Sequence, residues 1–121
     1  LNKLIIKNKM QDRVNFLGSL KSSQIIAEIK KSKFFISLTE YEGFGMSIAE
    51  CAVAGLEIIV TDLPVLREVL GNYPVDFVDL KDLDDISKKI NEKLSHNLVN
   101  AKSKNMLYTW SDAAKTIRKS L

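Results

Sequence analysis

Apolar positions along the chain fall into short runs, and segments with helical spacing separate these runs. Runs that are apolar almost throughout are typical of strands covered by helices on both faces. The four runs are residues 14–17, 34–38, 57–61 and 75–78. Between and after them, apolar residues recur every three or four positions, as in Leu83, Ile86, Ile90 and Leu94. This alternation predicts an α/β fold in which one parallel sheet carries helices on both faces.

The segment 42–50 joins the apolar run 34–38 to a helical pattern, and two glutamates, Glu42 and Glu50, flank its Gly-Phe-Gly turn. Glycines let the backbone approach a ligand closely. The N–H groups that open the following helix suit a phosphate, and Glu50 lies about one turn into that helix. Because ligands of open α/β sheets bind beyond the carboxyl ends of the strands, we predict the binding site here.

Composition indicates a single globular domain, which we take as 1–121. The chain is 45% hydrophobic and 27% charged, as ordinary globular proteins are. No apolar run approaches the roughly 20 residues that cross a bilayer. Cys51 is the single cysteine, so no internal disulfide can form, which fits a reducing compartment. We therefore expect a cytoplasmic location.

The net charge of +3 is mild, although lysines cluster in two places. The two clusters are Lys30, Lys31 and Lys33, and Lys88, Lys89 and Lys93. A basic face can meet nucleic acid or an anionic membrane. No aromatic residues interleave with these lysines, so we interpret them as solvated helix surface and expect no nucleic-acid partner.

Several motifs, taken in order, resemble one known family. Val-Asn-Phe-Leu-Gly at 14–18 resembles its V-x-F-L-G strand, the segment 42–50 resembles its E-x7-E motif, and 54–71 resembles the segment after that motif. Trp110 before a terminal helix also fits. Together they resemble the C-terminal, donor-binding half of a retaining GT-B glycosyltransferase of the group 1 (family 4) type. The resemblance implies a Rossmann-like, three-layer α/β/α fold, here reduced to about four strands.

In that family the donor is a sugar nucleotide held between two Rossmann-like domains. The resemblance implies that Glu42 lies near hydroxyls of the transferred sugar, and we assign it as the catalytic candidate. It implies that Glu50 bonds the ribose hydroxyls, and a carboxylate can accept two hydrogen bonds from a vicinal diol. Backbone N–H groups near the helix start would hold the sugar and the diphosphate. The residues assigned to nucleotide-sugar binding are Gly43, Phe44, Gly45, Met46, Ser47 and Glu50.

Two parts of the family pattern have no counterpart here. The Arg and Lys that grip the diphosphate come from a strand–helix unit that no segment of this chain matches, and the acceptor-binding N-terminal domain is missing as well. We expect the chain to be part of a longer enzyme and inactive alone. The resemblance implies a parent enzyme in bacterial surface polysaccharide synthesis, with peripheral association at the inner face of the membrane.

The missing unit has a structural consequence for the sheet. In the family, two strands lie between those matching 14–17 and 34–38. Without them, one edge of the strand 34–38 is unpaired and apolar, and exposed edges recruit partners. We predict either direct pairing of 14–17 with 34–38 or a homo-oligomer formed across that edge.

No metal or cofactor is expected. Asp82 and Asp84 form an Asp-x-Asp pair that binds a divalent metal in other glycosyltransferases, but GT-B enzymes lack that motif and a helix cap is favoured here. His96 is the only histidine, and no Cys or His partner is spaced for a metal site. Cys51 on a helix of small residues indicates a buried, inert thiol.

Other interpretations remain open. Glu42 and Glu50 can be ordinary surface carboxylates, and Phe44 can be a pocket wall or a partly exposed plug. Arg67 and Glu68 can contact ligand or form an ion pair on a helix surface. The alternative function is a non-catalytic Rossmann-like module for nucleotide binding or interaction. A receiver domain would need paired acids at the end of its first strand, and 14–18 has none.

Overall fold

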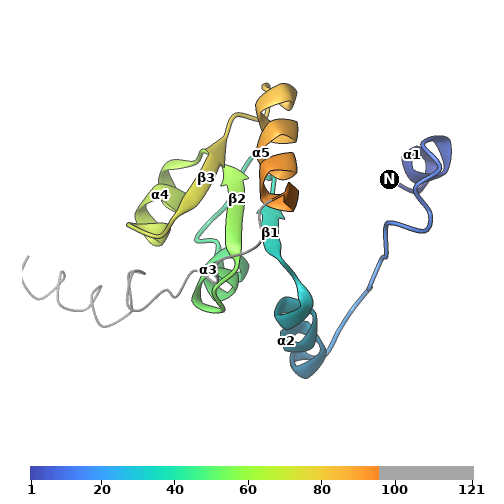
Figure 1. The fold of residues 1–121 in the computed structure, drawn as a ribbon. Coiled ribbons are helices and arrows are strands. Elements are labelled where there is room, and N and C mark those ends of the chain that lie inside the picture. The colour runs from blue at the N-terminus through green and yellow to red at the C-terminus, as the bar shows by residue number, and fades with distance from the viewer. Residues whose placement is uncertain (96–121) are drawn as a thin grey trace, which may run out of the picture.

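The structure is a computed structural model that describes residues 1–95 (Figure 1). Its elements, in chain order, are α1 (Asn2–Lys7), α2 (Ser22–Lys31), β1 (Phe34–Ser37), α3 (Met46–Val53), β2 (Glu57–Thr61), α4 (Pro64–Leu70), β3 (Val75–Val78) and α5 (Leu83–Ser95). The predictions for His96, Trp110 and the terminal helix lie outside the described residues.

The three strands form one parallel sheet in the order β1-β2-β3. Phe34 of β1 lies opposite Glu57, and Ile58 of β2 lies opposite Val75. The runs 57–61 and 75–78 were predicted with the bounds that the structure shows, because each is apolar, short and followed by turn residues. All carboxyl ends of the strands therefore lie at one edge of the sheet.

Helices cover both faces of this sheet. Ile58 and Val60 pack on one face with buried residues of α3 and α4, such as Ile48 and Leu66. Ile59, which alternates with them along β2, packs on the other face with α5. The result is the predicted three-layer, Rossmann-like α/β/α arrangement, with α5 crossing the front of the sheet in Figure 1.

The predicted strand 14–17 is wrong, and the described sheet has three strands instead of about four. The segment runs extended between α1 and α2, away from the sheet (Figure 1). Phe16 is 62% exposed and Leu17 is 53% exposed. Strand-like side chains make a strand only where a neighbour receives the backbone hydrogen bonds, and none of β1, β2 and β3 pairs with this segment. Its predicted pairing with 34–38 is therefore also wrong, and association between chains stays a prediction.

At the amino end of the sheet, one lysine and two acids form a single network of ion pairs. The Lys93 ammonium on α5 lies 2.6 Å from Glu57 Oε2 at the start of β2 and 2.7 Å from Asp76 Oδ2 on β3. Burial alone would lower the pKa of Lys93, but its hydrogen bonds to Asp76 and Glu57 outweigh burial and raise it. Beside them the buried Tyr73 hydroxyl donates to the Leu56 carbonyl at 2.6 Å. Glu57, an unusual residue at the start of a strand, is thus explained by its ion pair.

Candidate functional site

The loop between β1 and α3 folds around the side chain of Glu42. One carboxylate oxygen, Oε1, accepts the backbone N–H of Gly43 at 3.1 Å, of Gly45 at 3.0 Å and, more weakly, of Phe44 at 3.5 Å. Successive N–H groups that converge on one anionic oxygen form a concave anion site. Within residues 1–95 the other oxygen, Oε2, accepts no hydrogen bond. Glu42 thus shapes the loop with one oxygen and leaves the second available.

Gly45 sets the direction in which the chain enters α3. It caps the helix in the left-handed region, with φ of 79°, where residues with a side chain are strained. A Cβ at this position would lie 2.7 Å from Cδ2 of Leu66 on α4. Close approach to a ligand was the role predicted for this glycine, and packing against α4 requires a glycine here as well. A Cβ at Gly43 would meet nothing within 4 Å, so space beside the loop lies open there.

The first turn of α3 presents its polar groups outward. Gly45 has no side chain to cap the helix, and Met46 and Ser47 are exposed. Glu50, one turn further along the same helix, is exposed as well. Within residues 1–95 its carboxylate makes no hydrogen bond or ion pair. In the part of the chain that the structure describes, the helix start thus offers N–H groups that no side chain caps, with an exposed carboxylate close by along the helix.

Phe44 and Met46 bring apolar surface to the same loop. Phe44 is 38% exposed and Met46 is 53% exposed. Of the two interpretations given for Phe44, the structure fits a partly exposed side chain. Large apolar groups beside exposed amides are a common lining of small-molecule sites.

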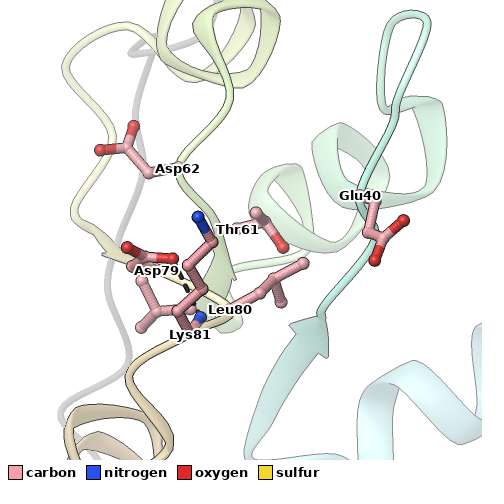
Figure 2. A pocket seen from close by; sticks show the side chains of 7 residues that line it. Glu40, Thr61, Asp62, Asp79, Leu80 and Lys81 are labelled. Carbon is pink, nitrogen blue, oxygen red and sulfur yellow. Dashed lines mark hydrogen bonds between the residues drawn. The ribbon is translucent and has the colours of Figure 1, made fainter.

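A pocket of about 640 Å³ opens next to this loop, at the carboxyl ends of all three strands (Figure 2). Glu40 approaches it from the segment after β1, while the other lining residues come from the ends of β2 and β3. The lining residues are Glu40, Thr61, Asp62, Val78, Asp79, Leu80 and Lys81. The pocket occupies the edge of the sheet at which open α/β folds bind ligands.

Two of the pocket's acids are held by local contacts. Both oxygens of Asp62 accept from Arg67, from Nε at 2.6 Å and from Nη2 at 2.7 Å. The Arg67 hydrogen bonds lower the pKa of Asp62, and the Arg67 guanidinium also lies 4.5 Å from the centre of the Phe77 ring. Asp79 Oδ1 accepts the backbone N–H of Lys81 at 2.9 Å. Arg67 therefore forms an ion pair on the surface, as one interpretation expected, although its partner is Asp62 and not Glu68.

Thr61 is the exception to this pairing. It is 6% exposed, and its Oγ1 has no hydrogen-bond partner among the described residues. Most buried polar groups in native proteins are hydrogen-bonded, so an unpaired one calls for an explanation.

Asp82 and Cys51 behave as the sequence indicated. Asp82 caps α5 by accepting the Asp85 N–H at 2.9 Å, which confirms the cap interpretation for the Asp-x-Asp pair. Cys51 is buried. Burial, and to a smaller extent the nearby Glu50 charge, raises the pKa of its thiol.

Across residues 1–95, no three His, Cys, Asp or Glu side chains are grouped so that they could hold a metal ion. None of the helices in that range is long and apolar enough to span a bilayer.

The structure brings together only some of the predicted site residues. Glu42 contacts Gly43, Phe44 and Gly45 through the loop hydrogen bonds, whereas Glu50 makes no bond to that loop.

The sequence did not predict the pocket at the carboxyl ends of the strands. Acids at or just beyond the end of each apolar run would have indicated it: Asp62 and Asp79 follow their runs directly, and Glu40 lies two positions after Leu38.

Comparison with known proteins gives a family match over most of the chain. The sequence model of the family described as "Glycosyl transferases group 1" matches residues 1–114. No solved structure matches the chain.

Curated relatives are glycosyltransferases from bacteria and eukaryotes. GDP-mannose:cellobiosyl-diphosphopolyprenol alpha-mannosyltransferase of Xanthomonas campestris is 36% identical over 64 residues, or 53% of this chain and 17% of the relative. The phosphatidylinositol N-acetylglucosaminyltransferase gpi3 subunit of Schizosaccharomyces pombe is 29% identical over 93% of this chain and 26% of the relative. Serotype-specific mannosyltransferase WbdA of Escherichia coli is 31% identical over 83% of this chain and 13% of the relative. The chain spans about a quarter of these relatives' lengths at most.

Proposed function

The chain belongs to the group 1 glycosyltransferase family, and we propose that its described part binds the sugar-nucleotide donor of such an enzyme at the loop between β1 and α3. The observation that carries this proposal is the set of loop N–H groups that converge on Glu42 Oε1, directly before a helix whose first turn has no side-chain cap among residues 1–95. A loop that already holds one carboxylate oxygen is suited to negative charge.

Glu42 would have two roles in donor binding, one for each oxygen. Oε1 keeps the loop in shape by accepting from Gly43 and Gly45. Oε2 would accept a hydrogen bond from a hydroxyl of the transferred sugar, because a carboxylate is an acceptor only. This division makes Glu42 both a positioning residue for the loop and the contact to the sugar.

The diphosphate would lie at the N-terminus of α3. The N–H groups of Met46 and Ser47 open that helix, and the positive end of the helix dipole favours a phosphate there. When the bond between the sugar and the diphosphate breaks, negative charge grows on the leaving oxygen. Donors already fixed at that position stabilise the charge without reorganisation.

Glu50 would complete the nucleotide site. It lies one turn beyond Met46 on α3, is exposed, and pairs with no other described residue. The two hydroxyls of a ribose can donate to one carboxylate, so a free carboxylate near the phosphate site suits the sugar of the nucleotide.

The complete reaction requires more than the described residues provide. We propose that a longer enzyme supplies the acceptor domain and the remaining cations for the diphosphate, and that the chain alone transfers no sugar. The names of two relatives include a polyprenol-linked and a phosphatidylinositol substrate. They support a parent that extends a glycan on a lipid-linked acceptor. We propose that this parent lies in the cytoplasm at a membrane surface and acts in bacterial surface polysaccharide synthesis.

A titration of the full chain with GDP and UDP tests the proposal. We expect amide NMR shifts centred on residues 43–50, and a several-fold weaker dissociation constant in Glu50→Gln because one charge-assisted contact is lost. Glu92→Gln on α5 is the matched control and should bind as the unmodified chain does. No shift in this segment at about 10 mM nucleotide, which is beyond the range of weak specific sites, would instead support the non-catalytic module.

A further inference from the structure

Tyr41 is an exposed aromatic residue between two parts of the binding edge. Its side chain is 85% exposed, more than any other aromatic residue among 1–95 and as much as Leu1 at the start of the chain. Its two neighbours fix where it lies. Glu40 reaches the pocket at the carboxyl ends of the strands (Figure 2), and Glu42 binds the loop amides. Tyr41 therefore lies at the rim where the pocket meets the proposed donor loop.

The backbone that carries Tyr41 is held in place on its carboxyl side. Glu42, the next residue, accepts the N–H groups of Gly43 and Gly45 at 3.1 Å and 3.0 Å. Gly45 in turn packs closely against Leu66 of α4. An aromatic ring on an anchored backbone has only two side-chain torsions to order when a ligand binds, so the entropic cost of the contact is small.

The charges beside Tyr41 favour a neutral ligand group over a phosphate. Carboxylates precede and follow it in the chain, at Glu40 and Glu42, and neither forms an ion pair with another residue of 1–95. A diphosphate next to two such acids would be repelled. A neutral group with hydroxyls meets no repulsion there, because its hydroxyls can donate to the carboxylates.

The order of groups in the proposed donor site indicates the same ligand part. Along the chain, Glu42 would contact the sugar, the first N–H groups of α3 the diphosphate, and Glu50 the ribose. Tyr41 comes before Glu42 and so lies beyond the sugar end of this series. A sugar ring has C–H groups that an aromatic ring can cover, and the Tyr41 hydroxyl can donate to or accept from a sugar hydroxyl.

We propose that Tyr41 contacts the transferred sugar of the donor and contributes to the specificity for a sugar nucleotide over the free nucleoside diphosphate. The inference rests on the proposed function, because the donor loop gives the sugar its place. The contact exists only while the sugar is attached to the nucleotide, so it is lost when the sugar is transferred.

The test is a titration of the full chain with two ligand pairs, GDP against GDP-mannose and UDP against UDP-glucose, followed by amide NMR. We expect Tyr41→Ala to weaken the binding of the sugar nucleotide about fivefold, the scale of one aromatic contact, and to leave the binding of the nucleoside diphosphate unchanged. Tyr41→Phe keeps the ring and should bind within about twofold of the unmodified chain. Phe16→Ala, which removes an exposed ring away from the sheet, is the matched control.

Thermal unfolding shows whether the variant still folds. Because Tyr41 is 85% exposed, Tyr41→Ala should unfold at the same temperature as the unmodified chain. A loss of binding in a folded variant is then a loss of contact with the ligand.

The outcomes separate this inference from the proposed donor site. Unchanged affinity of Tyr41→Ala for the sugar nucleotide overturns the sugar contact, and so does an equal loss for sugar nucleotide and nucleoside diphosphate. In both cases the nucleotide still shifts residues 43–50, so the donor site stands. If none of the four ligands shifts 43–50, the donor site is contradicted, and the role of Tyr41 with it.

Discussion

The two ends of the parallel sheet treat polar groups in opposite ways. At the amino end, Lys93 lies between Glu57 and Asp76 with its side chain 16% exposed, and both acids are neutralised. At the carboxyl end, Glu40 and Asp79 form no ion pair among the described residues, and the buried Thr61 hydroxyl has no partner there. The comparison indicates that ion pairs at the amino end hold the layers together, whereas the carboxyl end keeps polar groups that no described residue pairs; this difference is the basis on which we propose the carboxyl end as the binding end.

Replacing Lys93 with methionine should have the largest effect on stability. The substitution leaves Glu57 and Asp76 facing each other without a cation, and breaking a buried pair costs several kcal/mol. Because Asp76 is 37% exposed, we expect a smaller loss, about 2.5 kcal/mol in urea unfolding. Lys88→Met is the control, since its exposed partner Glu92 lies 4.0 Å away, and it should change little. Equal losses of unfolding free energy in both variants would contradict a stabilising role for the ion pairs at the amino end of the sheet.

Gly45→Ala should have the second-largest effect on stability, and it alters the loop at the carboxyl end of the sheet. The new Cβ would lie 2.7 Å from Leu66 Cδ2 at a positive φ, so strain and crowding should together cost about 2 kcal/mol. The loop amides would also lose their alignment on Glu42, which should weaken nucleotide binding. Gly43→Ala, where a Cβ meets nothing, should be nearly neutral for stability. Thermal unfolding of both variants measures the difference.

Alkaline pH should lower the free energy of unfolding, because it removes the charge of Lys93 and ionises Tyr73 at the amino end of the sheet. The pKa of Lys93 is raised by its acids despite burial, so the stability that it contributes is complete below the ordinary lysine pKa and is lost as pH rises through the higher folded value. Burial, followed by the Glu57 charge, raises the pKa of Tyr73, which also makes stability fall as pH rises. We expect unfolding free energy to be constant from about pH 7 to 8, to fall slightly above the ordinary cysteine pKa because burial also raises the pKa of Cys51, and to decline more steeply above about pH 10. Tyr73→Phe should flatten part of that decline.

Thr61→Val should have the smallest effect on stability, and in the opposite direction. Removing an unpaired buried hydroxyl should leave the unfolding free energy unchanged or raise it by about 0.5 kcal/mol. A loss above 1 kcal/mol, roughly the worth of a satisfied hydrogen bond, would show that the hydroxyl is structural and that the two ends of the sheet differ less than proposed.

The sequence predicted those parts of the fold that depend on local patterns. The strands at 57–61 and 75–78, the proline at the start of α4 and the cap at Asp82 all follow from residues close together in the chain. The segment 14–17 looks equally strand-like but lacks a neighbouring strand, and a pattern of side chains cannot show whether a neighbour is present.

The sequence identified the loop 42–50 as a candidate, but it did not predict the geometry of that loop. The segment 42–50 was recognised from its glycines and acids, yet the turn of Glu42 back onto its own loop depends on the φ of Gly45 and on contact with Leu66. The Lys93 bridge joins residues 36 positions apart, which no spacing rule relates. The pocket forms only when three strand ends meet, so it was missed although each of its acids follows an apolar run.

One measurement tests the difference between the two ends most directly: an amide shift map of the full chain saturated with GDP. We predict that the perturbed residues lie at the carboxyl edge, centred on 43–50, and that the amides of Glu57, Asp76 and Lys93 stay unchanged. A map centred on those three residues, or one without localised shifts, would contradict the assignment of the loop and the start of α3 as the donor site.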